Sequence, residues 1–572
     1  MLEKNWQVKS PVEAKRLTEF PQINPVILQL LFNRGINDQQ KIDAFLNPDY
    51  GENLHDPFLF SEMDKAVERI MLAVENNEKI VIYGDYDADG VTASAILMET
   101  LQNLGAKPEI YIPFRETEGY GLNKEAAENL IKKKFKLLIT VDCGISNKKE
   151  VELLENNGVA VIITDHHHEP LKLPSAFAII NPHLAKEKYP FKNLAGCGVA
   201  FKVAQAIVRR HNDYQVKKLP EGFEKWLLDL VAIGTIADLQ PLLGENRVLV
   251  KYGLVVLQKT KRLGILKLIE LMNSNLTQID ERVVGWQISP RLNAAGRLNH
   301  ASSAYHLLIT DDLVNAERLA LELNKTNQER QQITDKINLE ARQLLGEIGD
   351  KKILIIIGQN WPVGVVGLVA GRITDEFHRP SLVISRYNGE IVGSGRSIPE
   401  FNMIEAIEKC DKYLARYGGH AQACGFTVKD EENLKKFILE MEKLAQQQLK
   451  DKKLVPILEI DAEIKLEDVN WELFEELKKF IPYGEGNPKP KFLAKGLTVK
   501  EKQTIGRDGK HLRLMVQHTT TIIRKTIGFC FGDWCAKLKT GDKIDMVFEV
   551  DVNEWNGNQE LQLKIIDLKI RE

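Results

Sequence analysis

The stretch 79–92 constrains the fold of this chain more than any other. Its apolar run 79–83 is typical of a buried strand, and the apolar run that starts at its end is typical of a helix. Between the two runs Asp85, Asp87 and Asp89 stand at alternate positions, so extended backbone would direct their carboxylates to one side. Carboxylates crowded in this way repel one another unless a hard divalent cation such as Mg²⁺ or Mn²⁺ binds them. A solvated acidic turn is the alternative interpretation.

Later apolar runs also end in side chains that can bind metal. They are Asp142 after the run 135–141, Asp165-His166-His167-His168 after 159–164, and Asp238 after 227–235. In an open parallel sheet, ligands bind outside the carboxyl ends of the strands. Because acids or imidazoles follow several such runs, the pattern favours a dinuclear metal site over a set of solvated loops.

The motifs around these ligands resemble a known superfamily. Asp-His-His at 165–167, with Asp-Tyr-Asp-Ala-Asp-Gly at 85–90 upstream, resembles the DHH phosphoesterases. Longer motifs, at 118–122, 194–200, 290–297, 418–420 and 482–488, narrow the resemblance to the RecJ family, the single-strand-specific 5′→3′ DNA exonucleases of bacteria. The similarity runs from about residue 15 to the C-terminus.

The resemblance implies a ligand set for two ions, with Mn²⁺ usually preferred and Mg²⁺ often accepted. Asp142 would bridge the ions, and the catalytic group would comprise Asp89, Asp142 and His167. His167 would contact the phosphate or assist protonation, and His168 would be structural. The metal ligands implied are Asp85, Asp87, Asp89, Asp142, His166 and Asp238, of which Asp89, His166 and Asp238 would complete one site and Asp87, with Asp85, the other.

Substrate contacts are expected outside the metal cluster. In the loop 113–122 an arginine could hold a phosphate with its two-pronged guanidinium and a tyrosine could stack on a base, although a plain surface loop is the alternative. Glycines near 393–397 would let backbone N–H groups approach an anion. The resemblance implies a phosphate pocket there, facing the metals, at which the 5′ end of the DNA stops. The positions expected to bind substrate are Arg115, Tyr120, Arg291, Arg297, Ser394, Arg396, Gly419 and His420.

Length and hydropathy indicate several domains in one α/β chain of 572 residues. We expect a helical lead-in (1–65), a doubly wound DHH catalytic domain with following helices (66–310), a long connecting helix (311–345), a DHH-associated α/β domain (346–450) and an OB-type β-barrel (451–572). The connecting segment 311–345 contains neither glycine nor proline, which is typical of one uninterrupted helix.

Charge is distributed unevenly along the chain. Residues 488–572 carry 16 basic and 11 acidic side chains, a balance of +5, which leaves −8 for the rest of a chain with net charge −3. Basic residues there alternate with Phe492, His511, Phe529, Phe531 and Trp555, a mixture that suits single strands held by charge and stacking. Use of the phenylalanines in a barrel core is the competing interpretation.

The remaining features indicate a cytoplasmic enzyme. No apolar run is long enough to span a bilayer, the N-terminus shows no signal-peptide pattern, and the six cysteines form no CxxC pair. We therefore expect a monomeric, metal-dependent exonuclease that degrades single-stranded DNA from the 5′ end to mononucleotides in DNA repair and recombination, with a helicase or a single-strand-binding protein as candidate partners. The alternatives are an oligonucleotide or cyclic-dinucleotide phosphodiesterase of the same superfamily and a non-catalytic single-strand-binding relative.

Overall fold

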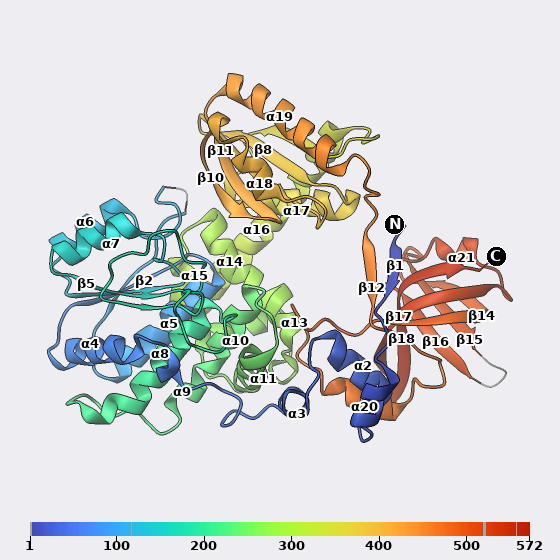
Figure 1. The fold of residues 1–572 in the computed structure, drawn as a ribbon, viewed down its shortest axis with the longest axis horizontal. Helices are drawn as coiled ribbons and strands as arrows, with labels where there is room; N and C mark the ends of the chain where they lie inside the picture. Colours follow the sequence, from blue (N-terminus) through green and yellow to red (C-terminus); the bar gives the residue numbers. More distant parts are fainter. Residues whose placement is uncertain (1–2, 116, 519–521, 556, 572) are drawn as a thin grey trace. The chain divides into compact units, whose positions relative to one another are not determined.

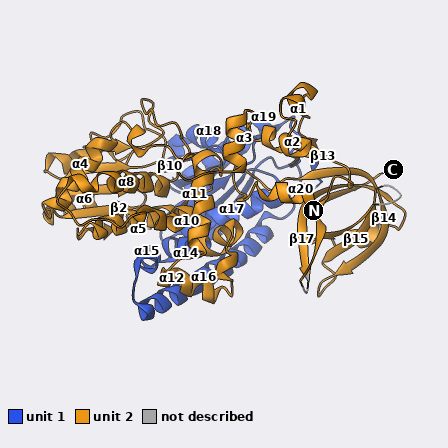
Figure 2. Ribbon diagram, turned by 90° about the horizontal axis from the view of Figure 1, so that it is seen from below, with its two compact units in different colours: residues 1–5, 290–457 blue, residues 6–289, 458–572 orange. Residues whose placement is uncertain are grey.

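The computed structural model describes residues 3–115, 117–518, 522–555 and 557–571. It divides into two compact units. One comprises residues 1–5 and 290–457, and the other comprises residues 6–289 and 458–572 (Figure 2). The C-terminal segment therefore belongs to the same unit as the segment that carries the aspartates.

The larger unit contains a parallel sheet in the order β3-β2-β4-β5-β6, of which β2 and β5 are labelled in Figure 1. Its strands are β2 (Ile80–Gly84), β3 (Glu109–Tyr111), β4 (Leu137–Val141), β5 (Ala160–Thr164) and β6 (Ala178–Ile180). The three central strands are buried apolar runs with helices between them, as βαβ units require. The predicted doubly wound sheet is confirmed.

Helices cover both faces of this sheet. Helices α6 (Lys124–Lys132) and α7 (Lys148–Asn156) share one core with it, and the other face meets α4 (Met63–Glu75), α5 (Ala88–Asn103) and α8 (Gly196–Arg210). The helices that follow are α9 (Phe223–Trp226), α10 (Leu228–Ala237), α11 (Gly244–Leu257), α12 (Leu263–Leu271), α13 (Glu281–Val283) and the π-helix η4 (Val284–Ile288). Helix α10 is buried nearly throughout and packs against both α5 and α8.

The C-terminal segment forms the predicted barrel. After β12 (Ile457–Ile460), β13 (Ala462–Glu463) and α20 (Trp471–Lys478) come the barrel strands, and the sheet closes because β14 pairs with both β15 and β17. The elements are β14 (Phe492–Ile505), β15 (His511–Gln517), β16 (Ile523–Gly528), α21 (Trp534–Lys537), β17 (Lys543–Trp555) and β18 (Asn558–Ile570).

The N-terminal lead-in shares its core with this barrel. It contains β1 (Asn5–Val8), α1 (Ala14–Glu19), α2 (Pro25–Asn33) and α3 (Gln39–Leu46). Ile27 and Phe45 belong to one hydrophobic cluster with Phe480 and the barrel residues Phe492 and Phe548. The first and last segments of the chain therefore form one packed body.

The smaller unit is a second α/β fold. Helix α16 (Leu313–Leu345) is one uninterrupted helix, as predicted, capped by Asp312 at its start. The sheet order is β10-β11-β9-β8-β7, with only β7 and β8 parallel. The other elements are α14 (Ser289–Leu298), α15 (Ser302–Ile309), β7 (Leu354–Gln359), α17 (Val363–Phe377), β8 (Ser381–Tyr387), β9 (Glu390–Arg396), α18 (Met403–Glu408), β10 (Leu414–His420), β11 (Ala423–Val428) and α19 (Glu431–Leu449).

Candidate metal centre and substrate sites

The predicted ligands meet at the carboxyl edge of the parallel sheet. Asp85 follows β2, Asp142 follows β4, and His166 lies two residues after β5. Asp238 arrives from a different element, because it caps the C-terminal end of α10. The fold thus brings together side chains that are up to 153 positions apart, as the distance from Asp85 to Asp238 in the sequence shows.

Their ligand atoms form three overlapping clusters, each with all atoms within 4.8 Å of one another: Asp89, His166 and Asp238; Asp85, Asp87 and Asp142; and Asp142, His166 and His167. His166 Nε2 lies 3.1 Å from Asp142 Oδ1, 3.7 Å from Asp238 Oδ2 and 3.9 Å from Asp89 Oδ2. Asp142 shares a cluster with Asp85 and Asp87 and lies 3.1 Å from His166, a member of the cluster with Asp89 and Asp238, so its position suits a ligand shared by two ions.

Local backbone geometry fixes two of the aspartates. Asp87 caps α5, and its Oδ1 accepts hydrogen bonds from the backbone N–H groups of Asp89 (2.9 Å) and Gly90 (3.0 Å). Asp142 has a φ of 60°, which is unusual for a residue other than glycine. Strained backbone of this kind is concentrated at functional sites.

The start of helix α8 holds Asp89. The backbone N–H groups of Gly196 and Cys197 donate to its two carboxylate oxygens at 2.6 and 2.8 Å. A helix N-terminus interacts favourably with an anion, so the start of α8 fixes the position of this buried carboxylate. The motif 194–200 contains no predicted ligand, and its glycines were the signal from which a close approach of the backbone could have been predicted.

Asp165 orients His167. Its Oδ1 lies 2.8 Å from His167 Nδ1 and accepts the backbone N–H groups of His166 and His167, while Oδ2 accepts that of Ile145 at 3.0 Å. Burial opposes the charged imidazole, but the hydrogen bond and charge of Asp165 raise the pKa of His167 to about 9. The first residue of the Asp-His-His triplet is therefore a positioning group, a role that sequence analysis did not assign.

Burial and mutual repulsion make the charged form of the clustered aspartates energetically unfavourable. Burial raises the pKa of Asp85, Asp87 and Asp142, and neighbouring aspartates raise it further. The same causes raise the pKa of Asp238 to about 8. Burial lowers the pKa of His166, which favours the neutral imidazole that binds metals.

The donor set fits divalent cations. Asp85 Oδ1 and Asp142 Oδ1 are buried and accept no hydrogen bond from the described residues, so each has a free lone pair in a site of several carboxylates and imidazoles. Oxygen and imidazole donors together suit Mn²⁺ and also accommodate Mg²⁺.

The loop after β3 places both of its predicted residues near this cluster. Tyr120 Oη lies 3.1 Å from His167 Nδ1 and donates to the backbone oxygen of Asp142 at 3.2 Å. The Tyr120 ring is about half exposed, and the exposed Arg115 places its guanidinium 5.0 Å from the ring centre of Tyr86. These two side chains remain available to a substrate.

In the smaller unit, Ser394 and Arg396 lie on β9, Gly419 and His420 lie on β10, and β11 runs between these two strands; Arg291 and Arg297 lie on α14. Ala423 on β11 pairs with Arg396 on β9 and with His420 on β10, so those two residues lie on either side of one strand. Arg396 donates to Ser394 Oγ at 3.0 Å. Gly419 has a φ of 146° and lies in strand β10, and an added Cβ would meet Ala423 O at 2.3 Å.

A cationic cavity of about 290 Å³ adjoins Arg396. Arg330 from α16 and Arg372 from α17 line it as well, and Gly367 and Gly371 leave the backbone of α17 uncovered. Arg330 Nε is buried without a hydrogen-bond partner among the described residues. In the same unit, Arg291 Nε donates to Asn324 Oδ1 at 3.0 Å, and Arg297 donates to Gly364 O at 3.1 Å. Such a cavity suits an anion.

The barrel aromatics divide into two groups. Phe492 and Phe531 are buried in the hydrophobic core of the barrel, so for these two the competing interpretation holds. Phe529 is about half exposed and makes an edge contact with His511 at 5.4 Å between ring centres. The side chain of Trp555 lies outside what the structure describes.

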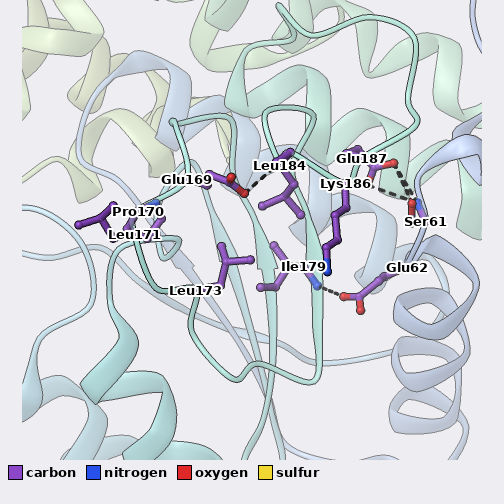
Figure 3. A pocket seen from close by; sticks show the side chains of 11 residues that line it. Ser61, Glu62, Glu169, Pro170, Leu171, Leu173, Ile179, Leu184, Lys186 and Glu187 are labelled. Carbon is purple, nitrogen blue, oxygen red and sulfur yellow. Dashed lines mark hydrogen bonds between the residues drawn. The ribbon is translucent and has the colours of Figure 1, made fainter.

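A separate cavity of about 440 Å³ lies beside the edge strand β6 (Figure 3). Leu171, Leu184 and Ile179 line it, and Glu62 accepts the backbone N–H of Ile179 at 2.6 Å. None of its lining residues belongs to the metal clusters, so we assign it no part in the chemistry.

Models of three protein families match successive parts of the chain. The DHH family, N-terminal domain, matches residues 79–235, the DHHA1 domain matches residues 350–447, and the RecJ OB domain matches residues 460–567. The three matches coincide with the parallel-sheet fold, the second α/β fold and the barrel.

Known proteins resemble the chain over nearly its full length. A Bacillus subtilis protein described as single-stranded-DNA-specific exonuclease RecJ is 37% identical over 99% of this chain and 71% of its own. The crystal structure of Thermus thermophilus RecJ with Mn²⁺ superimposes with a TM-score of 0.84 at 29% identity, covering 99% of this chain and 80% of that one. The same protein with Mg²⁺ gives a TM-score of 0.77 at 28% identity, covering 99% and 78%.

Proposed function

The chain belongs to the RecJ family of single-stranded-DNA-specific exonucleases, and from its site we propose that it hydrolyses single-stranded DNA from the 5′ end with two divalent ions. The observation that carries this proposal is the set of overlapping aspartate and histidine clusters at the carboxyl edge of the sheet. Every metal ligand expected from the resemblance is present there, which disfavours a non-catalytic single-strand-binding relative.

We assign the ligands of the two ions from the clusters. Asp89, His166 and Asp238 would hold one ion, and Asp85 and Asp87 would hold the other. Asp142 would bridge them. Two ions held there would activate a water, neutralise the phosphate and stabilise the leaving oxygen. The names of the solved relatives support Mn²⁺ or Mg²⁺, and we propose Mn²⁺ as the preferred ion.

The protein's own groups position the phosphate. The raised pKa of His167 keeps its imidazole protonated at neutral pH, so it can donate to a phosphate oxygen or to the leaving oxygen. Asp165 and the Tyr120 hydroxyl hold that ring in place. Arg115 lies in the same loop as Tyr120 and would contact the DNA strand next to the metal site.

The cavity at Arg396 would bind the terminal 5′ phosphate. Its arginines provide charge-assisted hydrogen bonds, and Ser394, Gly419 and His420 lie on the adjoining strands. A pocket that stops the chain end would leave one linkage for hydrolysis at a time and release mononucleotides. Arg291 and Arg297 would guide the strand.

We expect strict end and strand selectivity. A strand labelled at its 5′ end should release labelled mononucleotide at once, whereas a 3′ label should appear only in progressively shorter strands. A blunt duplex should resist digestion, because we propose that the site accepts one DNA strand rather than two. A time course with Mn²⁺ on both labelled strands and on the duplex measures this. Early release of the 3′ label, or rapid digestion of the duplex, would contradict the proposed polarity.

We expect Mn²⁺ to raise the melting temperature, and the increase to grow with pH. At pH values between about 4 and 8 the folded chain retains protons on Asp238 that the unfolded chain has lost, so ionisation destabilises the fold as pH rises, and a cation offsets this effect. Protons also compete with metal for the same carboxylates. At a concentration of 100 Kd, binding adds about 2.7 kcal/mol of stability. Thermal melts in Mn²⁺ and in a chelator, at pH 6 to 8, test this expectation; a pH-independent increase would argue against these ligands.

The proposal extends to the cellular setting. We propose a role in DNA repair and recombination as a monomer in the cytoplasm, with a helicase or a single-strand-binding protein supplying the single strands. No helix in the described part of the chain is long and apolar enough to cross a membrane.

A further inference from the structure

The motif Pro-Tyr-Gly-Glu-Gly-Asn-Pro at 482–488 has no role in the chemistry described so far. It forms the loop between α20 and β14, outside the barrel strands, and contributes no metal ligand. The loop lies against Pro241, Leu242 and Leu243, the segment that follows Asp238. A motif of the C-terminal module therefore contacts the chain three residues beyond a candidate metal ligand.

The contact between the loop and this segment is close. The backbone N–H of Leu242 donates to Glu485 O at 2.8 Å, and Leu242 is buried. A Cβ added at Gly484 would lie 2.7 Å from Leu242 Cδ1, and one at Gly486, where φ is 68°, would lie 3.1 Å from Pro241 Cβ. A side chain at Gly484 would therefore displace Leu242, and one at Gly486 would press on Pro241 and strain the loop backbone.

Arg247 fastens the same junction from the catalytic side. It lies on α11, is almost fully buried, and donates to Phe480 O at 2.9 Å, Lys479 O at 2.5 Å and Ile481 O at 3.1 Å. A further bond at 2.9 Å goes to Phe45 O in the lead-in. One guanidinium thus joins the catalytic fold, the lead-in and the residues just before the loop.

Side chains of the loop hold its shape. Asn487 is fully buried and donates to Phe480 O at 2.7 Å and Pro482 O at 2.8 Å. Its own oxygen accepts Arg34 Nε at 2.7 Å, which ties the loop to the lead-in as well. The loop is therefore a rigid support.

The supported segment leads directly into the metal cluster. Gln240 Nε2 donates to Asp238 Oδ2 at 2.9 Å and lies 3.5 Å from His166 Nδ1. Leu239, between them, has a φ of 56°, so the chain turns sharply at this point. Movement at Leu242 would be transmitted through this short turn to the Asp238 carboxylate.

We propose that the loop 482–488, fastened by Arg247, positions Asp238 and Gln240 for metal binding. The C-terminal module is then a part of the metal site as well as a surface that holds DNA. This inference rests on the proposed function in one respect, namely that Asp238 binds metal.

Point substitutions test the inference better than removal of the module, because the lead-in would lose its core with the barrel. Arg247→Met removes the bonds to the residues before the loop, and Gly484→Ala is a milder change that displaces Leu242. Arg34→Met is the matched control, since the side chain of Arg34 is also buried and bonds the loop, at Asn487 and Pro488. It joins the loop to the lead-in, and its ion pair is with Asp461.

We expect Arg247→Met and Gly484→Ala to weaken Mn²⁺ binding about tenfold, as changes next to metal ligands commonly do. Titration followed by electron paramagnetic resonance measures this without turnover. On an oligonucleotide too short to reach the barrel, kcat should fall with little change in KM. Arg34→Met should lower the melting temperature to a similar degree but leave Mn²⁺ affinity and short-substrate kcat within about twofold of the parent.

Each outcome bears on the inference. Parent-like Mn²⁺ affinity and short-substrate turnover in both folded variants, with a defect on long strands alone, would overturn it and leave the loop a spacer for DNA binding. An equal loss of Mn²⁺ affinity in Arg34→Met would also overturn it, because a general loosening of the loop would then explain the loss of affinity. If Arg247→Met does not fold, Gly484→Ala decides. Failure of the parent itself to degrade single strands would refute the proposed function, while the binding titrations would still test the loop.

Discussion

Replacing Asp142 with asparagine should abolish hydrolysis while leaving the fold intact. Asp142 belongs to two of the three ligand clusters, and we propose that it bridges the two ions. Removal of its charge should therefore weaken the binding of both ions at once. We expect turnover to fall by at least about 10³-fold, equivalent to about 4 kcal/mol of transition-state stabilisation. Single-turnover assays on a 5′-labelled strand at saturating Mn²⁺ measure the effect.

The choice of asparagine follows from the backbone. With a φ of 60° at position 142, asparagine is tolerated better than alanine, so the substitution separates charge from strain. Burial and four neighbouring aspartates raise the pKa of Asp142, so in a chelator the variant should melt at or above the parent's temperature. Strand binding without metal should persist. Hydrolysis at near-parent rates by the folded variant would remove Asp142 from the mechanism.

The sequence was sufficient to predict that the candidate ligands lie together, because their signal is local. An apolar run that ends in an acid or imidazole indicates both a buried strand and a ligand at its carboxyl end, which is why Asp85, Asp142 and His166 could be placed together. The long helix α16 and the barrel strands carry similarly local signals. The assignment of particular ligands to each of the two ions came from the resemblance to a family, because no local sequence pattern contains it.

What could not be predicted depends on contacts between distant segments. The N–H groups of Gly196 and Cys197 meet Asp89 across more than a hundred residues, and Arg247 meets carbonyls near residue 480. Phe492 shows the same limit, because alternation along a strand does not reveal which face of a closed barrel is inside. Backbone donors and buried arginines leave no periodic pattern in a sequence.

Gly196→Ala should strongly impair hydrolysis although it adds a single methyl group. A Cβ at this position would lie 2.6 Å from Asp142 Cβ and 2.8 Å from its Cγ, so the Asp142 carboxylate, which we propose as the bridging ligand, must move or the start of α8 must withdraw. Withdrawal would lengthen the 2.6 Å bond from Gly196 N to Asp89 Oδ2. Either response displaces a metal ligand, and displacement by about 1 Å can cost about 10²-fold in rate.

The matched control is Gly198→Ala, in the same turn of the same helix. Its Cβ would approach only a side chain, Leu194 Cδ2 at 3.2 Å, so any loss of helix or core stability should be similar while the ligands stay in place. We expect Gly198→Ala to retain turnover within a few-fold and Gly196→Ala to lose about 10²-fold, with matched melting temperatures in a chelator. Equal turnover in the two variants would mean that α8 does not fix Asp89 and Asp142. A loss confined to Gly196→Ala would show that the helix start sets the spacing between the two ions, because it contacts one ligand of each cluster directly.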